Sequence, residues 1–164
     1  MPVPETKDAK LEFKRATSDQ DIQQIYEYTI DAFVDFSPES KWSIREIKNE
    51  VNDGWQLYGV FHKGKVISAL FLKLKGDALL TKNTAIEQDY QGSGFSHRIK
   101  EFYEQQARAA HLTKIVHYCA IDDFRMYSLN ESHGYHKTDR HPDKHGLMTE
   151  WVRDLTDGFV RKKD

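Results

Sequence analysis

The stretch Gln91-Gly92-Ser93-Gly94-Phe95-Ser96 is the most informative part of this chain. It follows an apolar run that predicts a strand over residues 78–86, and it opens a strongly amphipathic run that predicts a helix. Such a turn leaves backbone N–H groups pointing outward at the positive end of a helix macrodipole. Glycine reaches dihedrals that other residues avoid and lets a bulky anion approach the main chain. The stretch therefore predicts a seat for a phosphate or diphosphate.

Composition indicates one soluble domain with no strong charge bias. The chain has 164 residues, enough for a single core, and its 24 basic and 26 acidic residues give a net charge of −2. We therefore expect no binding to nucleic acid through a global positive field, and none to an anionic membrane. No apolar run approaches the roughly 18 residues that a membrane span needs.

Cysteine usage and the N-terminal residues predict a cytoplasmic protein. Cys119 is the single cysteine, which excludes a disulfide framework. The first ten residues are polar and lack the apolar core of a secretory signal. We expect these residues to form a flexible arm.

Periodicity and turn residues predict a mixed α/β fold with the order β-α-α-β-β-β-α-β-α-β-β. Hairpins early in the chain and helical crossovers late in it imply a mixed sheet. We expect one domain over residues 11–155 and a polar tail over 156–164. The predicted strands cover residues 11–15, 55–61, 66–75, 78–86, 114–121, 135–138 and 147–152, and the predicted helices cover 21–36, 43–51, 95–110 and 124–133.

Two common phosphate-binding motifs do not fit the glycine-bearing turn. A Rossmann domain needs repeated βαβ units and a full G-x-G-x-x-G fingerprint. A P-loop needs G-K-[ST], whereas Phe95 follows Gly94 here.

The segment from Ile86 to Ser96 resembles the acyl-CoA-binding signature [RQ]-x-x-G-x-[GA] of the GNAT superfamily of N-acetyltransferases. Gln91 and Gly94 match this signature, and Ser96 replaces its final small residue. The order of elements over about residues 11–155 is also similar to that fold. The run from Asp123 to Tyr135 resembles the late helix of the family, which ends in a glycine followed by an aromatic residue.

The resemblance implies that acetyl-CoA is the acyl donor, with its diphosphate on the N–H groups of residues 92–97. It implies that the pantetheine arm runs beside residues 84–86 like an added strand, in a slot opposite residues 117–122. Asp123 matches the asparagine that often begins the family's late helix. The implied cofactor-binding residues are Thr84, Ala85, Ile86, Gln91, Gly92, Ser93, Gly94, Phe95, Ser96, His97 and Asp123.

The catalytic groups depart from the family pattern. The family's tyrosine acid lies four residues before the glycine, and that position is Asn130 here. Tyr127, one turn earlier, is an alternative acid. Glu87 is our candidate for a water-mediated base, with His117, Asp122 and Asp123 as other groups near the slot.

The predicted function is transfer of an acetyl group from acetyl-CoA to a primary amine of a small molecule, amino acid derivative or peptide. A coenzyme A-binding sensor or interaction module without turnover is the alternative, because Asn130 occupies the acid position. A third reading is a metal site formed by His133, His136, His141 and His145, although their loop-like surroundings favour solvated histidines and we assign no metal. The resemblance is compatible with a homodimer, but no stretch specifies an interface.

Overall fold

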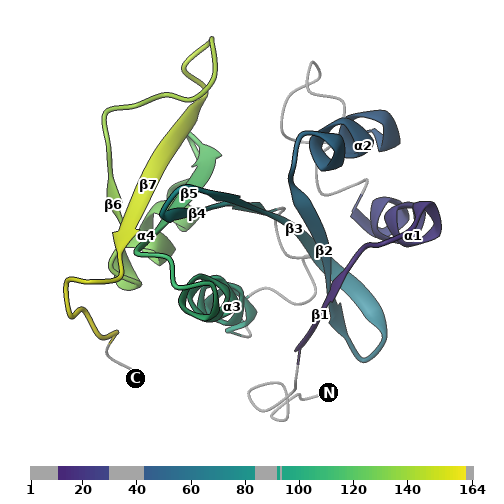
Figure 1. Ribbon diagram of the computed structural model, residues 1–164, viewed down its shortest axis with the longest axis horizontal. Helices are drawn as coiled ribbons and strands as arrows, with labels where there is room; N and C mark the ends of the chain where they lie inside the picture. Colours follow the sequence, from purple (N-terminus) through teal and green to yellow (C-terminus); the bar gives the residue numbers. More distant parts are fainter. Residues whose placement is uncertain (1–10, 30–42, 84–91, 93, 162–164) are drawn as a thin grey trace. The chain divides into compact units, whose positions relative to one another are not determined.

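The computed structural model describes residues 11–29, 43–83, 92 and 94–161. Its elements follow the predicted order, and the strands form a seven-stranded mixed sheet with the order β1-β2-β3-β4-β5-β7-β6 (Figure 1). The predicted mixed α/β class is confirmed. The chain divides into two compact units, one made of Met1–Leu72 with Asn83–Arg98 and the other of Lys73–Lys82 with Ile99–Asp164. The predicted domain boundaries stay predictions.

The first unit contains an antiparallel sheet of β1 (Leu11–Arg15), β2 (Gln56–His62) and the larger part of β3 (Lys65–Lys75). The turn between β2 and β3 has positive φ at Lys63 (49°) and Gly64 (81°), which is the geometry of a two-residue hairpin of type I′. The predicted hairpin is therefore confirmed, with its turn at the predicted residues.

Helices α1 (Asp19–Thr29) and α2 (Ile44–Asn52) lie on the same side of this sheet (Figure 1). Each begins at a serine: Asp21 N–H donates to Ser18 Oγ (3.1 Å), and Glu46 N–H donates to Ser43 Oγ (3.1 Å). Buried Ile25 and Ile47 supply their apolar faces. Residues 30–36, which the sequence assigned to the first helix, lie outside the described residues.

The second unit is built on β4 (Ala78–Asn83), β5 (Lys114–Ala120), β7 (Met148–Asp154) and the short β6 (His136–Lys137). Strands β4 and β5 are parallel, whereas β7 pairs antiparallel with both β5 and β6. In the β5–β7 register, His117 lies opposite Trp151 and Cys119 lies opposite Thr149, so these four side chains share one face of the sheet. Residues 84–86 of the predicted fourth strand lie outside the described residues.

Helices α3 (Phe95–Ala109) and α4 (Phe124–Ser132) pack on that face. The Tyr103 ring of α3 lies 5.8 Å from the His117 ring, and the Tyr127 ring of α4 lies 5.0 Å from the Trp151 ring, measured between centroids. Buried Phe95, Ile99, Phe102, Tyr103 and Ala107 form the core face of α3. On the same side, Gln106 is half-buried and Ala110, beyond the helix end, is exposed.

The C-terminal residues follow β7 and fold back onto the second unit. Arg153 donates through Nη2 to the Phe159 carbonyl oxygen (3.3 Å), and its guanidinium lies 4.9 Å from the centre of the Phe159 ring. That ring lies so close to Gly134 that a Cβ added there would approach Phe159 Cδ1 to 2.6 Å. Residues 156–161, predicted as a polar tail, thus include an aromatic side chain packed against the unit.

Candidate acyl-CoA site

The start of α3 has the backbone geometry that the glycine-bearing turn predicts. Gly92 and Gly94 have φ of 83° and 82°, in the left-handed region that favours glycine. A Cβ added at either position would meet no atom of the described residues within 4 Å, so these residues leave the space beside the main chain open. Arg98 N–H donates to the Gly94 carbonyl oxygen at 3.4 Å, which closes the first helical turn.

A buried aromatic side chain anchors this helix start within the first unit. Phe95 is 2 % exposed, and its ring lies 5.1 Å from the ring of His62 on β2. Ser96 and His97 follow with partial exposure. Because one side of the first turn is buried and the glycines are exposed, the helix presents its N-terminal backbone to solvent on the glycine side.

The structure therefore places five of the predicted cofactor-binding residues at this helix start: Gly92, Gly94, Phe95, Ser96 and His97. Thr84, Ala85, Ile86, Gln91 and Ser93 lie outside the described residues, as does the candidate base Glu87. Their predicted roles stay predictions.

The pairing between β4 and β5 stops before the carboxyl end of either strand. Among the described residues, its register ends at Thr81 opposite His117, although β4 runs on to Asn83. Strand β5 meanwhile stays paired with β7 as far as Ala120 opposite Met148. Ligands of open α/β sheets commonly bind outside the carboxyl ends of parallel strands, which is where the sequence predicts the slot.

His117, the last β5 residue paired with β4, is buried and is held as a neutral imidazole. Thr81 Oγ1 donates to the Val116 carbonyl oxygen (2.9 Å), so its hydroxyl can only accept from His117 Nδ1–H (2.8 Å). Nε2 is then the unprotonated nitrogen, and it has no hydrogen-bond partner among the described residues. Burial lowers the pKa of His117 well below its usual value, and the charge of Lys100 lowers it further. The structure thus makes His117 an internal group rather than a base open to solvent.

The two candidate acids on α4 differ in their surroundings. The Tyr127 hydroxyl donates to the Ile121 carbonyl oxygen (2.6 Å), and its ring packs between Phe124 and Trp151. Asn130 is fully buried, and neither atom of its side-chain amide has a hydrogen-bond partner among the described residues. Neither side chain therefore presents a free proton donor at the surface, because the Tyr127 hydroxyl is bonded to the main chain and Asn130 is buried.

The remaining candidate polar groups have structural contacts. Asp123 caps α4, because its Oδ1 accepts from Met126 N–H at 3.2 Å, whereas Asp122 is exposed. Cys119 is 6 % exposed, its Sγ lies 3.4 Å from Thr149 Oγ1, and burial raises the pKa of its thiol. A buried neutral thiol is suited to packing rather than to acting as a nucleophile.

The loop histidines do not gather around a common point. His133 is buried at the end of α4, whereas His136, His141 and His145 are exposed. His141 Nδ1 instead lies 3.0 Å from the Met148 carbonyl oxygen. Within the described part of the chain, no group of three or more His, Cys, Asp or Glu side chains could hold a metal ion. In the same part of the chain, every helix is too short or too polar to cross a membrane.

The buried polar side chains of the second unit that the sequence did not predict include Lys100, Tyr135 and Arg153. A signal for Lys100 does exist, since it lies three and seven residues before Tyr103 and Ala107, on one row of α3. Extending the row of Tyr103 and Ala107 back by one helical turn would have predicted that Lys100 is buried.

Known structures share this fold, although no family profile and no curated protein matches the sequence. The ribosomal-protein-S18-alanine N-acetyltransferase of Escherichia coli has a TM-score of 0.70 at 12% identity, over 94% of this chain and 100% of that one. A GNAT family acetyltransferase of Elizabethkingia anophelis with acetyl-CoA bound has a TM-score of 0.65 at 17% identity, over 88% and 98%. The PaiA N-acetyltransferase of Thermoplasma acidophilum in complex with coenzyme A has a TM-score of 0.66 at 13% identity, over 88% and 99%.

Proposed function

We propose that this chain, which has the fold of the GNAT acetyltransferases, is an acetyl-CoA-dependent N-acyltransferase. Its acceptor would be a primary amine of a small molecule, amino acid derivative or peptide. The observation that carries the proposal is the open start of α3, where Gly92 and Gly94 have positive φ and no atom of the described residues lies within 4 Å of an added Cβ. A diphosphate needs this combination of backbone N–H groups, helix dipole and close access.

Bound acetyl-CoA would supply an acyl thioester, and the chain would position it and the amine. Holding both reactants in line can lower the barrier by about 7–11 kcal/mol. The shortened β4–β5 ladder beyond Thr81 and His117 offers main-chain groups to a pantetheine arm in the manner of an added strand. The Ile86 N–H, outside the described residues, is our candidate donor to the thioester oxygen.

The amine must be neutral before it attacks, and the departing thiolate needs a proton. Glu87 stays our candidate for the base, acting through water. Tyr127 is the candidate acid, but its hydroxyl would have to leave the Ile121 carbonyl oxygen, to which it now donates. Asn130 carries no transferable proton, so its part would be limited to hydrogen bonding.

A second function, coenzyme A binding without turnover, is favoured by the same two side chains. Asn130 occupies the position of the family's acid, and the Tyr127 hydroxyl is already bonded to the main chain. The two functions share the binding site and differ only in whether thiol is released.

Binding is tested by thermal unfolding with acetyl-CoA. At 100 times its dissociation constant, a ligand stabilises the folded chain by about 2.7 kcal/mol. We expect Gly94→Val to abolish this stabilisation while the chain still folds, because the branched side chain would fill the open approach. Gly76→Val is the matched control, since Gly76 also has positive φ (61°) and open space but lies in the turn before β4.

Equal stabilisation of the Gly94 and Gly76 variants would contradict this placement of the site, and no stabilisation of the wild type would remove both functions. Release of free thiol across a panel of amines then separates them. Turnover with any amine supports the transferase, whereas binding without thiol release for every amine supports the sensor.

A further inference from the structure

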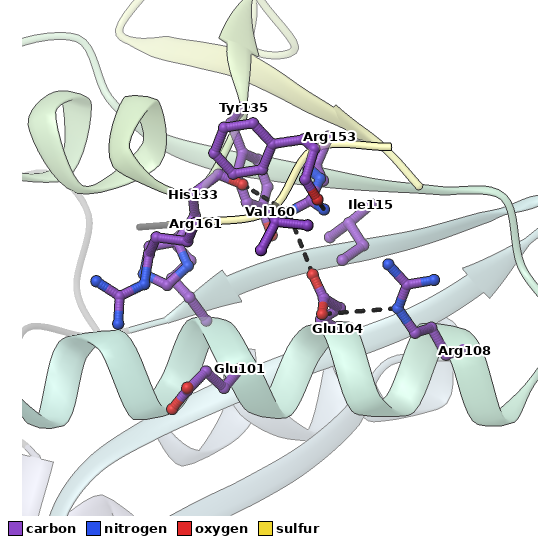
Figure 2. Close-up of a pocket in the computed structure, with 11 residues that line it drawn as sticks. Glu101, Glu104, Arg108, Ile115, His133, Tyr135, Arg153, Val160 and Arg161 are labelled. Atoms are coloured by element: carbon purple, nitrogen blue, oxygen red, sulfur yellow. Dashed lines mark hydrogen bonds and ion pairs between the residues drawn. The ribbon is translucent and has the colours of Figure 1, made fainter. Parts of the chain in front are cut away.

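The second unit contains a cavity of about 290 Å³ that the acyl-CoA site does not use (Figure 2). It lies between α3, Ile115 of β5, the end of α4 and the C-terminal residues 159–161. The start of α3 at Gly94 does not line it. Its charged lining residues are Lys100, Glu101, Glu104, Arg108, Arg153 and Arg161.

Positive charge exceeds negative charge around this cavity. Four of those six side chains are basic, three of them arginines and one a lysine, and two are carboxylates. The Glu104 carboxylate pairs with two guanidinium groups: its Oε1 lies 3.2 Å from Arg153 Nη1, and its Oε2 lies 3.6 Å from Arg108 Nε (Figure 2). One carboxylate therefore balances two arginines, and the lining keeps a positive surplus.

Two buried cationic side chains of the lining have donors that are not used. Lys100 is 2 % exposed, and its Nζ has no hydrogen-bond acceptor among the described residues. Its nearest aromatic neighbour is Tyr135, with Nζ 4.3 Å from the ring centre. Arg153 is 5 % exposed, and its Nε also has no acceptor in the described part of the chain.

Buried polar groups in native proteins almost always have partners, and an unpartnered buried donor is costly. Neither atom is accessible in the structure as it stands, so a partner in the cavity would reach them once the two side-chain ends turn toward it. The cavity is far larger than the roughly 15 Å³ that one water needs, so it has room for that movement and for a partner. Water could accept hydrogen bonds from these donors, but it would not neutralise the surplus charge. A small anion would do both.

We propose that this cavity binds a small oxyanion, either a tetrahedral sulfate or phosphate or a carboxylate, with Lys100 and Arg153 as its principal donors. Its volume of about 290 Å³ has room for such an ion together with several water molecules. The C-terminal residues Val160 and Arg161 form part of its wall, so occupancy would also stabilise their position. The site is independent of the proposed acyl transfer, and its failure would leave that function untouched.

Proton uptake should accompany binding. Burial lowers the pKa of Lys100 from 10.5 to about 7, partly countered by Cys119, so this amine is only partly protonated at neutral pH. An anion favours the ammonium form. Among the described residues, the other titratable or charged groups around Lys100 are His117 and Cys119 on β5, Tyr103 and Glu104 on α3, His133 at the end of α4, Tyr135 and Arg153.

The experiment is a titration of the full chain with sulfate and with acetate, followed by calorimetry, with chloride at matched ionic strength as the reference. Both anions keep their charge between pH 6 and 8.5. If only the protonated lysine binds, affinity should fall about thirtyfold over this range as Lys100 loses its proton. Preference for sulfate would identify a tetrahedral oxyanion site, and preference for acetate a carboxylate site.

Lys100→Met should weaken binding at least tenfold and reduce its pH dependence, whereas Lys137→Met, at an exposed residue of β6, should leave both unchanged. Equal affinity in the wild type and the Lys100 variant would overturn the proposal, as would wild-type binding no stronger than that of chloride. Titration of the Lys100 Nζ by NMR in the wild-type chain tests the same claim without a variant. Sulfate should raise its pKa by at least about one unit, and an unchanged value would also overturn the proposal.

Discussion

Replacing Lys100 with methionine should stabilise the fold, and more so at low pH. Lys100 is 2 % exposed, and burial lowers its pKa from 10.5 to about 7. Below pH 7 the lysine is protonated in both the folded and the unfolded chain, so the folded chain carries the full cost of a buried ammonium. Between pH 7 and 10.5 the folded chain has lost this proton while the unfolded chain keeps it. The wild-type free energy of unfolding therefore rises with pH across this window.

The size of the effect follows from the difference between the two pKa values. At about 1.4 kcal/mol per pH unit, that difference corresponds to about 5 kcal/mol below pH 7, falling to nearly zero at pH 10.5. Methionine keeps an unbranched stem of similar length and carries no charge. It loses the interaction of Nζ with the Tyr135 ring at 4.3 Å, worth about 0.5–2 kcal/mol. Desolvation wins, so we expect the variant to be more stable by about 3–4 kcal/mol at pH 6.

Urea unfolding, followed by tryptophan fluorescence at intervals from pH 6 to 10, measures this difference. Chloride buffers without oxyanions are needed, because an anion in the cavity would stabilise the wild type alone. Lys137→Met is the control and should follow the wild type at every pH. A wild type that is more stable than the Lys100 variant at pH 6, or a difference that does not change between pH 7 and 10, would refute the reasoning.

Three further substitutions test the packing around both sites. Gly134→Ala should cost about 1–3 kcal/mol of folding free energy, because φ there is 85° and the new Cβ would lie 2.6 Å from the Phe159 ring. Adding Phe159→Ala should recover the part of this cost that is due to the clash. A double-mutant cycle in urea would measure that part. Thr81→Val should cost about 1–3 kcal/mol by urea unfolding, since it removes both the bond to the Val116 carbonyl oxygen and the acceptor of His117 Nδ1–H. Tyr127→Phe should lose about 1 kcal/mol of stability with its bond to the Ile121 carbonyl oxygen and change thiol release only modestly; a drop of about a thousandfold in rate would instead identify it as the acid.

Local chemistry in the sequence was enough to predict most of the fold. Ser18 and Ser43 begin helices at their positions because each side-chain oxygen accepts from an N–H three residues later. Lys63 and Gly64 form the β2–β3 turn because a two-residue hairpin requires positive φ. Gly134, with φ of 85°, ends α4 as predicted. Each of these signals depends on only a few neighbouring residues, so it can be recognised in a single sequence.

The candidate site was predictable only in its backbone part. The open turn at Gly92 and Gly94 follows from residue type and from its place between a strand and a helix. The state of the side chains does not. That His117 is a neutral imidazole bonded to Thr81 depends on the parallel pairing of β4 with β5, which joins residues 36 positions apart. That the Tyr127 hydroxyl donates to the main chain depends on where β5 ends.

Lys100 shows why the charged interior was harder to predict than the apolar one. Lysine is rarely buried without a partner, so a lone lysine on a helix is assigned to solvent by default. The helix row of Lys100, Tyr103 and Ala107 gives the opposite prediction, but two adjacent rows of α3 are apolar and periodicity does not say which one lies deeper. What decides it is the cover supplied by Tyr135 and by the β5 face that carries His117, both distant in sequence. Local rules assume the least costly placement of every charge, and exceptions are expected where a protein uses the charge. A buried lysine that borders a cavity with surplus positive charge is such an exception, and for that reason we assign it a ligand rather than a packing role alone.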